Sequence, residues 1–197
     1  INWEESKQNP DILKIQLLKP LKPKDSVEIS VNYTVKLPKD KFTKYGYGDL
    51  NFHLKYWYLA PAIYNNKWEV YNNLDMDDLY IDYTNYNINF TIPSSFDLVT
   101  DLDQNKKENN LTTTYNLKGT NKLDVELIVT QYNNYINYNS NPTKIVSNLN
   151  ETELNTNLKT DILNRELLFL EKYIGKISTN KLLISNVEYE KNPVYGF

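Results

Sequence analysis

Cysteine is absent from this chain of 197 residues, and histidine occurs once, at His53. Disulfide bonds and thiolate metal sites are therefore excluded, and so is any site that needs two histidines. The zinc-peptidase motif H-E-x-x-H belongs to that excluded class. A serine triad would have to use His53, and no G-x-S-x-G motif accompanies it. Five scattered glycines form no phosphate-binding loop. We therefore expect no catalysis by this chain alone, no cofactor in it, and for His53 either a surface position or a strand-packing role.

Charge and hydropathy exclude two further classes of partner. The net charge is −3, Arg165 is the only arginine, and lysines are interspersed with acidic residues rather than clustered. This pattern predicts no nucleic-acid binding, because nucleic-acid binders concentrate basic residues on one face. No apolar run reaches the roughly 18 residues of a membrane span, so no transmembrane segment is expected. The chain begins at Ile1, which indicates a processed or truncated piece; removal of a signal peptide would favour a periplasmic or cell-surface location.

Most of the chain has the pattern of antiparallel β-structure. Residues 26–37 alternate strictly, which predicts a half-buried strand whose polar face is wet. Its predicted inner face consists of Val27, Ile29, Val31, Tyr33, Val35 and Leu37. Shorter strands are predicted at residues 12–18, 79–82, 86–92 and 96–102, and a hairpin around Gly119 at 111–117 and 122–130. Residues 103–110 have the charged composition of a solvated turn. We predict a mainly β fold, with an antiparallel sandwich or curved sheet over residues 1–139.

The pattern changes over residues 140–197, where we predict a β-α-β segment. A short strand at 144–146 precedes a helix near 151–173, with Asn150 as its N-cap and Gly175 as its left-handed end. The apolar run in residues 181–187 predicts a strand covered on both faces. Strand, helix and strand at this spacing form a parallel crossover. The helix and last strand need more apolar cover than this segment supplies, so further chain or a partner is expected to pack there.

An aromatic stretch from Tyr45 to Tyr71 holds two of the three tryptophans. Its alternation predicts a strand through Tyr58, and the Asn65-Asn66 pair predicts a turn before a second aromatic run. Two interpretations stay open: an aromatic core, or a wall that also faces a ligand or a second domain. The candidate residues for such a ligand or interdomain surface are Tyr56, Trp57, Tyr58, Tyr64 and Trp68.

Two acidic groups are candidates for calcium sites. Asp101, Asp103 and Asn105 have the spacing that opens an EF-hand loop, but Lys106 replaces its glycine and Thr112 its bidentate glutamate. This excludes an EF-hand. A second acidic group is interpreted as a solvated loop, with a calcium site as the alternative; it consists of Asp75, Asp77, Asp78 and Asp82.

The aromatic stretch and the residues after it, as far as Pro93, resemble the N-terminal β-domain of aminopeptidase N-like zinc peptidases, the gluzincins, of bacterial type. Bacterial members of that family often read Q-W-Y-P-x-x-A-V-Y, then, after a spacer, G-W, then D-F-x-D-Y-x-V-x-I-x-x-P. This chain reads Y-W-Y-L-A-P-A-I-Y from Tyr56 to Tyr64, then K-W at Trp68, then D-Y-T-N-Y-N-I-N-F-T-I-P from Asp82 to Pro93. The likeness spans most of the chain. Two departures are Tyr56, where the family has a polar residue that helps to hold the substrate's amino end, and Leu59, where it has proline.

The resemblance implies that residues 140–197 begin a thermolysin-like catalytic domain. A G-x-M-E-N loop would come next there, and Gly196 is the position that matches its glycine. The chain would then be a non-catalytic portion of a metallopeptidase, or of a degenerate relative, that shapes and covers the peptide-binding cleft. Its partners would be the downstream domain, which alone could carry zinc, and a peptide substrate. The alternative is a free-standing β-sandwich module that binds a carbohydrate or peptide through exposed tryptophan and tyrosine.

Overall fold

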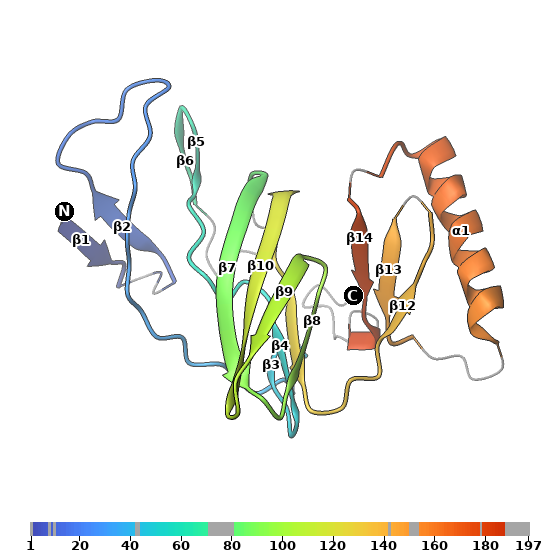
Figure 1. The fold of residues 1–197 in the computed structure, drawn as a ribbon. Coiled ribbons are helices and arrows are strands. Elements are labelled where there is room, and N and C mark those ends of the chain that lie inside the picture. The colour runs from blue at the N-terminus through green and yellow to red at the C-terminus, as the bar shows by residue number, and fades with distance from the viewer. Residues whose placement is uncertain are drawn as a thin grey trace. The chain divides into compact units, whose positions relative to one another are not determined.

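The computed structural model describes residues 2–7, 9, 11–41, 44–70, 81–141, 143–149, 154–177 and 179–187. The chain divides into two compact units (Figure 1). Unit 1 holds the described residues up to 36 together with 58–82, and unit 2 holds 37–57 and the described residues from 83 onward. The fold is mainly β, as the sequence predicts, with one long helix in the described part.

Unit 1 consists of two small antiparallel pairs and the chain between them. Strand β1 (Asn2–Glu5) pairs with β2 (Leu13–Gln16), and β5 (Ile63–Asn65) pairs with β6 (Lys67–Glu69). The predicted turn is present, because Asn66 adopts a left-handed φ of 59° between β5 and β6, a conformation that asparagine tolerates. None of the unit 1 residues that the structure describes is buried.

The prediction of a half-buried strand at residues 26–37 is wrong for the described structure. No described strand pairs with this stretch, and five of its six predicted inner side chains are between 40% and 48% exposed. An alternating sequence shows only that one face of an extended segment is apolar and the other polar. It does not supply the neighbouring strand that would satisfy the backbone and cover the apolar face.

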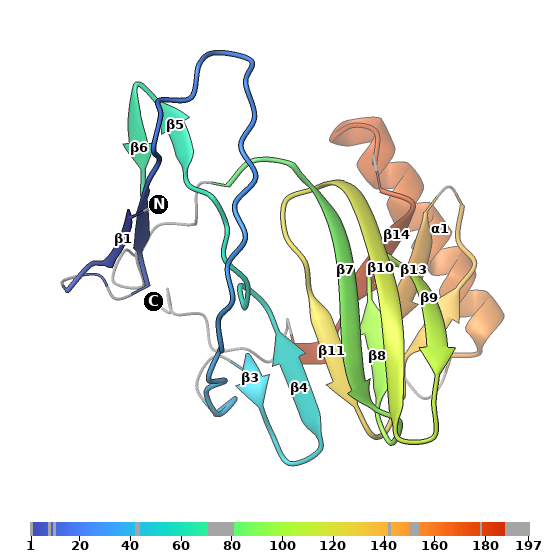
Figure 2. The same cartoon turned by 60° about the vertical axis from the view of Figure 1, so that its left-hand side comes forward.

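An outer sheet of unit 2 has the strand order β7-β10-β9 (Figure 2). Strand β7 (Thr84–Pro93) alternates as predicted, with its even-numbered residues turned inward, and pairs with β10 (Thr112–Lys122). Its solvent face carries a polar ladder, in which Asn116 Nδ2 donates to Asn89 Oδ1 at 2.9 Å. A sheet with one face on the core and one in solvent requires apolar side chains on the first face and polar side chains on the second.

Two sequence predictions fail in this sheet. Residues predicted as a solvated turn form the exposed edge strand β9 (Asp103–Glu108), which pairs with β10. A strand with no buried side chain has the composition of a turn, so the pattern could not separate them. Gly119 lies within β10 rather than at a hairpin turn, opposite Tyr86, and the Leu102 side chain fills the space beside it.

The central sheet of unit 2 has the order β3-β4-β11-β8. All four residues of β11 are buried, which requires cover on both faces. On one side the Tyr115 hydroxyl of β10 lies near the backbone of Leu98. On the other side Val99 and Ile128 pack against Val146. The strands are β3 (Gly46–Tyr47), β4 (Asn51–Leu54), β8 (Asp97–Thr100) and β11 (Leu127–Thr130).

A third sheet and the helix complete unit 2 and confirm the predicted β-α-β segment. Strand β12 (Ile136–Tyr138) pairs antiparallel with β13 (Lys144–Ser147), and β13 pairs parallel with β14 (Lys181–Ile184). Helix α1 (Thr156–Tyr173) connects the parallel strands, and its Leu167 is buried among side chains of this sheet. The predicted cover of the last strand on two faces is also present. Leu183 packs toward the central sheet and Leu182 toward the helix.

The helix begins at a different residue from the one predicted. Asn150 lies outside the described residues, and the cap is Asn155, whose Oδ1 accepts from the backbone N–H of Leu158 at 2.9 Å. The predicted C-terminal end is confirmed. Gly175 has a φ of 136°, and its N–H bonds the carbonyl of Leu170 at 3.2 Å, as a left-handed end requires.

Replacing the helix cap gives a first testable expectation. Asn155→Ala should lower the free energy of unfolding by about 1 kcal/mol, because a backbone donor in the first turn loses its acceptor. The matched control is Asn157→Ala, within the first turn of the helix, where alanine is the better helix former. Urea denaturation of the two variants checks this. A larger loss from Asn157→Ala would show that Asn155 is not the cap.

Candidate functional site

The structure distributes the five predicted surface residues over both units. Tyr56 and Trp57 end the first segment of unit 2, whereas Tyr58, Tyr64 and Trp68 belong to unit 1. The predicted strand through Tyr58 ends at Leu54, because Tyr56 adopts a left-handed φ of 54° that a strand cannot contain. The five residues therefore do not lie on one continuous strand.

An exposed aromatic pair lies on the β5–β6 hairpin. Tyr64 and Trp68 are directly opposite each other in the register, and their ring centroids are 5.2 Å apart in an edge-to-face arrangement. Each side chain is 64% exposed. Rings held by a strand pair keep their faces and edges available for stacking against a sugar or a peptide side chain. Tyr64 and Trp68 are therefore exposed aromatic side chains, and their role as a ligand or interdomain surface stays a prediction.

Tyr56 and Trp57 have different surroundings, although they are neighbours in the sequence. The Tyr56 ring is 52% exposed, and the ammonium of Lys55 lies 5.6 Å from its centroid and 5.5 Å from that of Tyr45. This is cation–π distance. Trp57 is half-buried, with its ring 5.8 Å from that of Phe90 in β7. Tyr56 is thus an exposed residue with the Lys55 ammonium over its ring, and Trp57 packs against the outer sheet of unit 2.

His53 is buried, so of the two predicted positions, surface or strand packing, the structure shows the packed one. Its partner was not predicted from the sequence. The ring is 5% exposed, and its Nε2 bonds Oε1 of Glu126, which follows Val125 just before β11. The Tyr45 ring meets it edge-on at 4.9 Å. The pair joins positions 73 residues apart. Because both side chains are largely buried, a solvent-borne substrate has no access to them, and we assign the pair a structural role.

A small polar cavity of about 70 Å³ lies between the central and third sheets. The Lys181 ammonium lines it and donates to the carbonyl of Leu102 at 3.2 Å. Burial lowers the pKa of Lys181, and the nearby carboxylate of Asp101 opposes that shift. The same Asp101 bonds the Lys122 ammonium at 2.6 Å. The space suits a few water molecules and is too small for a peptide, so this group joins the sheets rather than binding a substrate.

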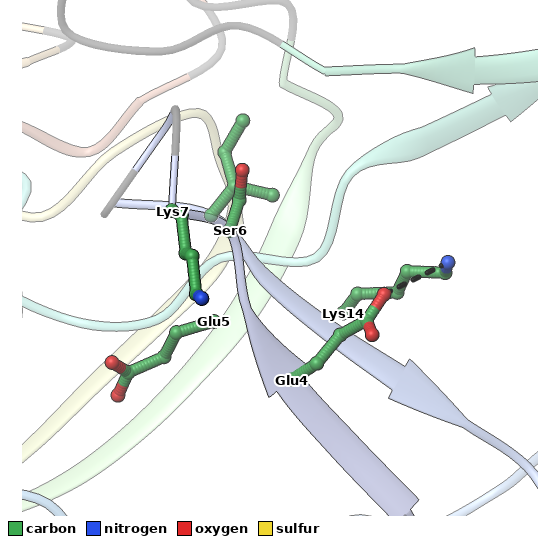
Figure 3. A pocket seen from close by; sticks show the side chains of 6 residues that line it. Glu4, Glu5, Ser6, Lys7 and Lys14 are labelled. Atoms are coloured by element: carbon green, nitrogen blue, oxygen red, sulfur yellow. Dashed lines mark hydrogen bonds and ion pairs between the residues drawn. The ribbon is translucent and has the colours of Figure 1, made fainter.

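A larger hollow of about 410 Å³ lies on the β1–β2 pair of unit 1 (Figure 3). Its lining includes Glu4, Lys14, Glu5 and Lys7, and the Glu4 and Lys14 side chains form an ion pair at 3.0 Å. Both side chains of this pair are mostly exposed. Exposed ion pairs are strongly solvated and contribute little to stability, so this ion pair does not mark the hollow as a functional site.

Metal ligands do not converge in the described part of the chain, where no group of three or more histidine or acidic residues could hold a metal ion. In the acidic group interpreted as a solvated loop or a calcium site, the aspartates at positions 75, 77 and 78 lie outside the described residues. No described helix is long and apolar enough to cross a membrane. Comparison of the chain with family models, curated proteins and solved structures finds no match.

Tyr135, in the wall of the small cavity, provides a pH-dependent test of this region. Its hydroxyl bonds Ser185 Oγ at 2.8 Å. Burial raises the pKa of Tyr135 above its ordinary value, with Glu126 adding to the rise and the Ser185 bond opposing it. The neutral phenol therefore stabilises the fold below the ordinary pKa of about 10, and that stability is lost as the pH rises through the raised value.

Tyr135→Phe should accordingly cost about 1 kcal/mol at neutral pH through the lost hydrogen bond. The difference in the free energy of unfolding between the variant and the wild-type protein should be smaller at about pH 11. The wild-type protein loses stability there as Tyr135 ionises, whereas phenylalanine does not ionise. Urea unfolding at both pH values measures this, and Tyr132→Phe, at an exposed tyrosine, is the control. A difference in the free energy of unfolding that grows with pH would contradict a buried, hydrogen-bonded Tyr135.

Proposed function

We propose that this chain is the non-catalytic N-terminal portion of an aminopeptidase-like zinc metallopeptidase, or of a degenerate relative, and that it shapes and covers a peptide-binding cleft. The observation that carries the proposal is the parallel β13-α1-β14 unit that follows the antiparallel sheets in the chain. A module built for binding alone has no need of this crossover. The aminopeptidase N-like resemblance, in contrast, has a thermolysin-like domain beginning at this point.

The outer surface of α1 supports a further domain as the partner. Leu168, Phe169 and Tyr173 are 57–64% exposed on the helix, and Ile174 follows them at 79%. An apolar face of this kind is typical of a helix that packs against more chain. In the proposed arrangement that chain is the downstream catalytic-like domain, which would hold any zinc.

Tyr56 is the residue of this chain that we assign to the cleft. It is open to solvent, and the family resemblance places there a polar residue that helps to hold the amino end of a peptide. A phenol can donate or accept one bond but cannot offer a carboxamide oxygen together with two N–H donors. The tyrosine therefore holds an amino terminus more weakly than the family's residue would.

The test uses the whole protein of which this chain is part, titrated with a short peptide and with its N-acetylated form. We expect the peptide with a free amino terminus to bind more tightly. Tyr56→Gln should increase that preference by about tenfold, since a hydrogen bond to a charged group contributes about 1.5–3 kcal/mol. Tyr64→Gln, on the β5–β6 hairpin, is the matched control and should change nothing. Equal binding of both peptides, or no response to Tyr56→Gln, would refute the proposal.

The exposed Tyr64–Trp68 pair favours the second candidate, a free-standing module that binds a carbohydrate or peptide. This candidate predicts that the 197-residue chain alone binds such a ligand with a change in tryptophan fluorescence. Trp68→Ala would then abolish binding, because a stacking ring is lost, while Tyr56→Gln would leave it unchanged. The two variants thus separate the candidates.

A further inference from the structure

The extended stretch at residues 26–37 has an unusual combination of properties. It contains no left-handed residue, leads along the chain from unit 1 into unit 2, and has no strand neighbour in the described part of the chain (Figure 2). One side chain in it is tethered, since the Tyr33 hydroxyl accepts from the backbone N–H of Leu59 at 3.4 Å. The stretch therefore presents strand edges whose backbone groups are available for pairing.

Its surroundings in unit 1 give it a reason to pair. The unit is built from two-stranded ladders, and no described residue of it is buried. A row of exposed apolar side chains is typical of a surface that another chain covers. The stretch already has such a face, formed by five apolar side chains that are at least 40% exposed: Val27, Ile29, Val31, Tyr33 and Val35.

The sequence of the stretch is complementary to itself when it is reversed. In an antiparallel pair centred on Asn32, Glu28 of each copy lies opposite Lys36 of the other, so two ion pairs form. On the other face apolar residues meet only apolar residues. The facing pairs are Val27 with Leu37, Ile29 with Val35, and Val31 with Tyr33. Opposite charges and apolar pairs directly across a ladder are the contacts that stabilise it.

Other registers lose this match. A shift by one residue places apolar side chains against polar ones on both faces. A shift by two keeps the faces but separates Glu28 from Lys36, and a parallel in-register pair places Glu28 against Glu28. Pro38, which cannot donate to a ladder, ends the pairing on each side.

We propose that two copies of this chain associate through residues 26–37, paired antiparallel about a two-fold axis at Asn32. The interface is isologous, with the same strand contributed by each copy. The charge pattern sets the register, and the apolar face buries side chains that unit 1 leaves exposed. The proposal is independent of the aminopeptidase-like function, because it uses no residue assigned to the cleft.

Charge reversal tests the proposal in the 197-residue chain by sedimentation equilibrium. Glu28→Lys and Lys36→Glu should each weaken the dimer by at least about tenfold, since like charges then face each other twice. The double variant E28K/K36E should restore wild-type association. An equimolar mixture of the two single variants should form a mixed dimer, because each supplies the charge that the other lacks. Circular dichroism spectra of the variants should match that of the wild-type chain, because the changed side chains are exposed.

Cysteine cross-linking fixes the register, since the natural chain has no cysteine. Asn32→Cys places two thiols on the axis and should oxidise to a covalent dimer. Ser30→Cys is the matched control, because its copies lie roughly 14 Å apart along the strands. Mixing Ser30→Cys with Thr34→Cys should again cross-link.

Four outcomes would overturn the proposal. Cross-linking of Ser30→Cys alone as fast as Asn32→Cys would show unspecific contact. A dimer that is unaffected by either charge reversal would show an interface elsewhere. A monomer at all concentrations, with the amides of residues 26–37 protected from hydrogen exchange, would show that another segment of the same chain takes the place of the second copy; an unprotected monomer would show that the strand stays unpaired.

Discussion

Replacing Glu126 by alanine is expected to lower the free energy of unfolding by about 3 kcal/mol, one of the two largest effects expected of a single substitution in this chain. The reason is the buried contact between the Glu126 carboxylate and the Nε2 atom of His53. The other ring nitrogen, Nδ1, is buried without a hydrogen-bond partner. Removing Glu126 therefore leaves the whole imidazole unsatisfied inside the protein, and an unpaired buried polar or charged group is costly.

Two control substitutions distinguish the effect of losing the hydrogen bond to His53 from the effect of shortening a glutamate side chain. Glu126→Gln keeps a carboxamide that can still bond Nε2, so its cost should be about 1 kcal/mol. Glu108→Ala removes an exposed partner of Lys106 and should change stability within error. Because His53 is the single histidine, its ring protons give one unmixed set of NMR signals, which should shift in both Glu126 variants. Equal stability of Glu126→Ala and the wild-type protein would contradict a structural role for the pair.

Leu127→Ala is expected to have an effect of similar size, a loss of about 2–5 kcal/mol in the free energy of unfolding. Leu127 lies in β11, is fully buried, and is flanked in the ladder by Leu54 of β4 and Thr100 of β8. A strand covered on both faces cannot collapse around a missing side chain, because sheets on either side hold it in place. The lost contacts and the remaining cavity therefore both lower the free energy of unfolding.

The matched control is Leu168→Ala on α1, where the same atoms are removed from a side chain that is 60% exposed. Its cost should be within about 0.5 kcal/mol in the 197-residue chain. Chemical denaturation followed by circular dichroism measures both. If the two substitutions cost the same, β11 is not the centre of the core. A large cost for Leu168→Ala alone would show that the outer face of α1 is already covered.

Local patterns predicted the elements whose pattern and partner lie close together in the chain. Strand β7 alternates from Tyr86 to Ile92 and forms as predicted. The parallel β13-α1-β14 unit also forms as predicted, because helix periodicity and a flanking apolar strand are properties of the segment itself. The turn at Asn66 and the helix end at Gly175 follow from residues that tolerate a left-handed backbone.

Predictions failed where the answer depended on a distant neighbour. Residues 26–37 have the clearest strand pattern in the sequence and remain unpaired in the described structure. Strand β9, with no buried side chain, has no strand pattern and is paired along its whole length with β10. Strand pairing requires two segments, so the composition of one segment does not determine whether it is paired.

The candidate site divides in the same way. The Asn65-Asn66 turn was predicted from the sequence, whereas the pairing of Tyr64 with Trp68 across it is a finding of the structure. Glu126 could not be identified as the partner of His53, nor Asp101 as that of Lys122, since no spacing rule links residues so far apart. The sequence by itself determined the mainly β class, the crossover at the C-terminal end and the absence of cysteine and of two-histidine zinc chemistry. Those properties follow from composition and short-range periodicity. The tertiary structure alone decided which strands pair, which charges are buried together, and how the aromatic residues divide between two units, because each depends on contacts that form only when distant segments meet.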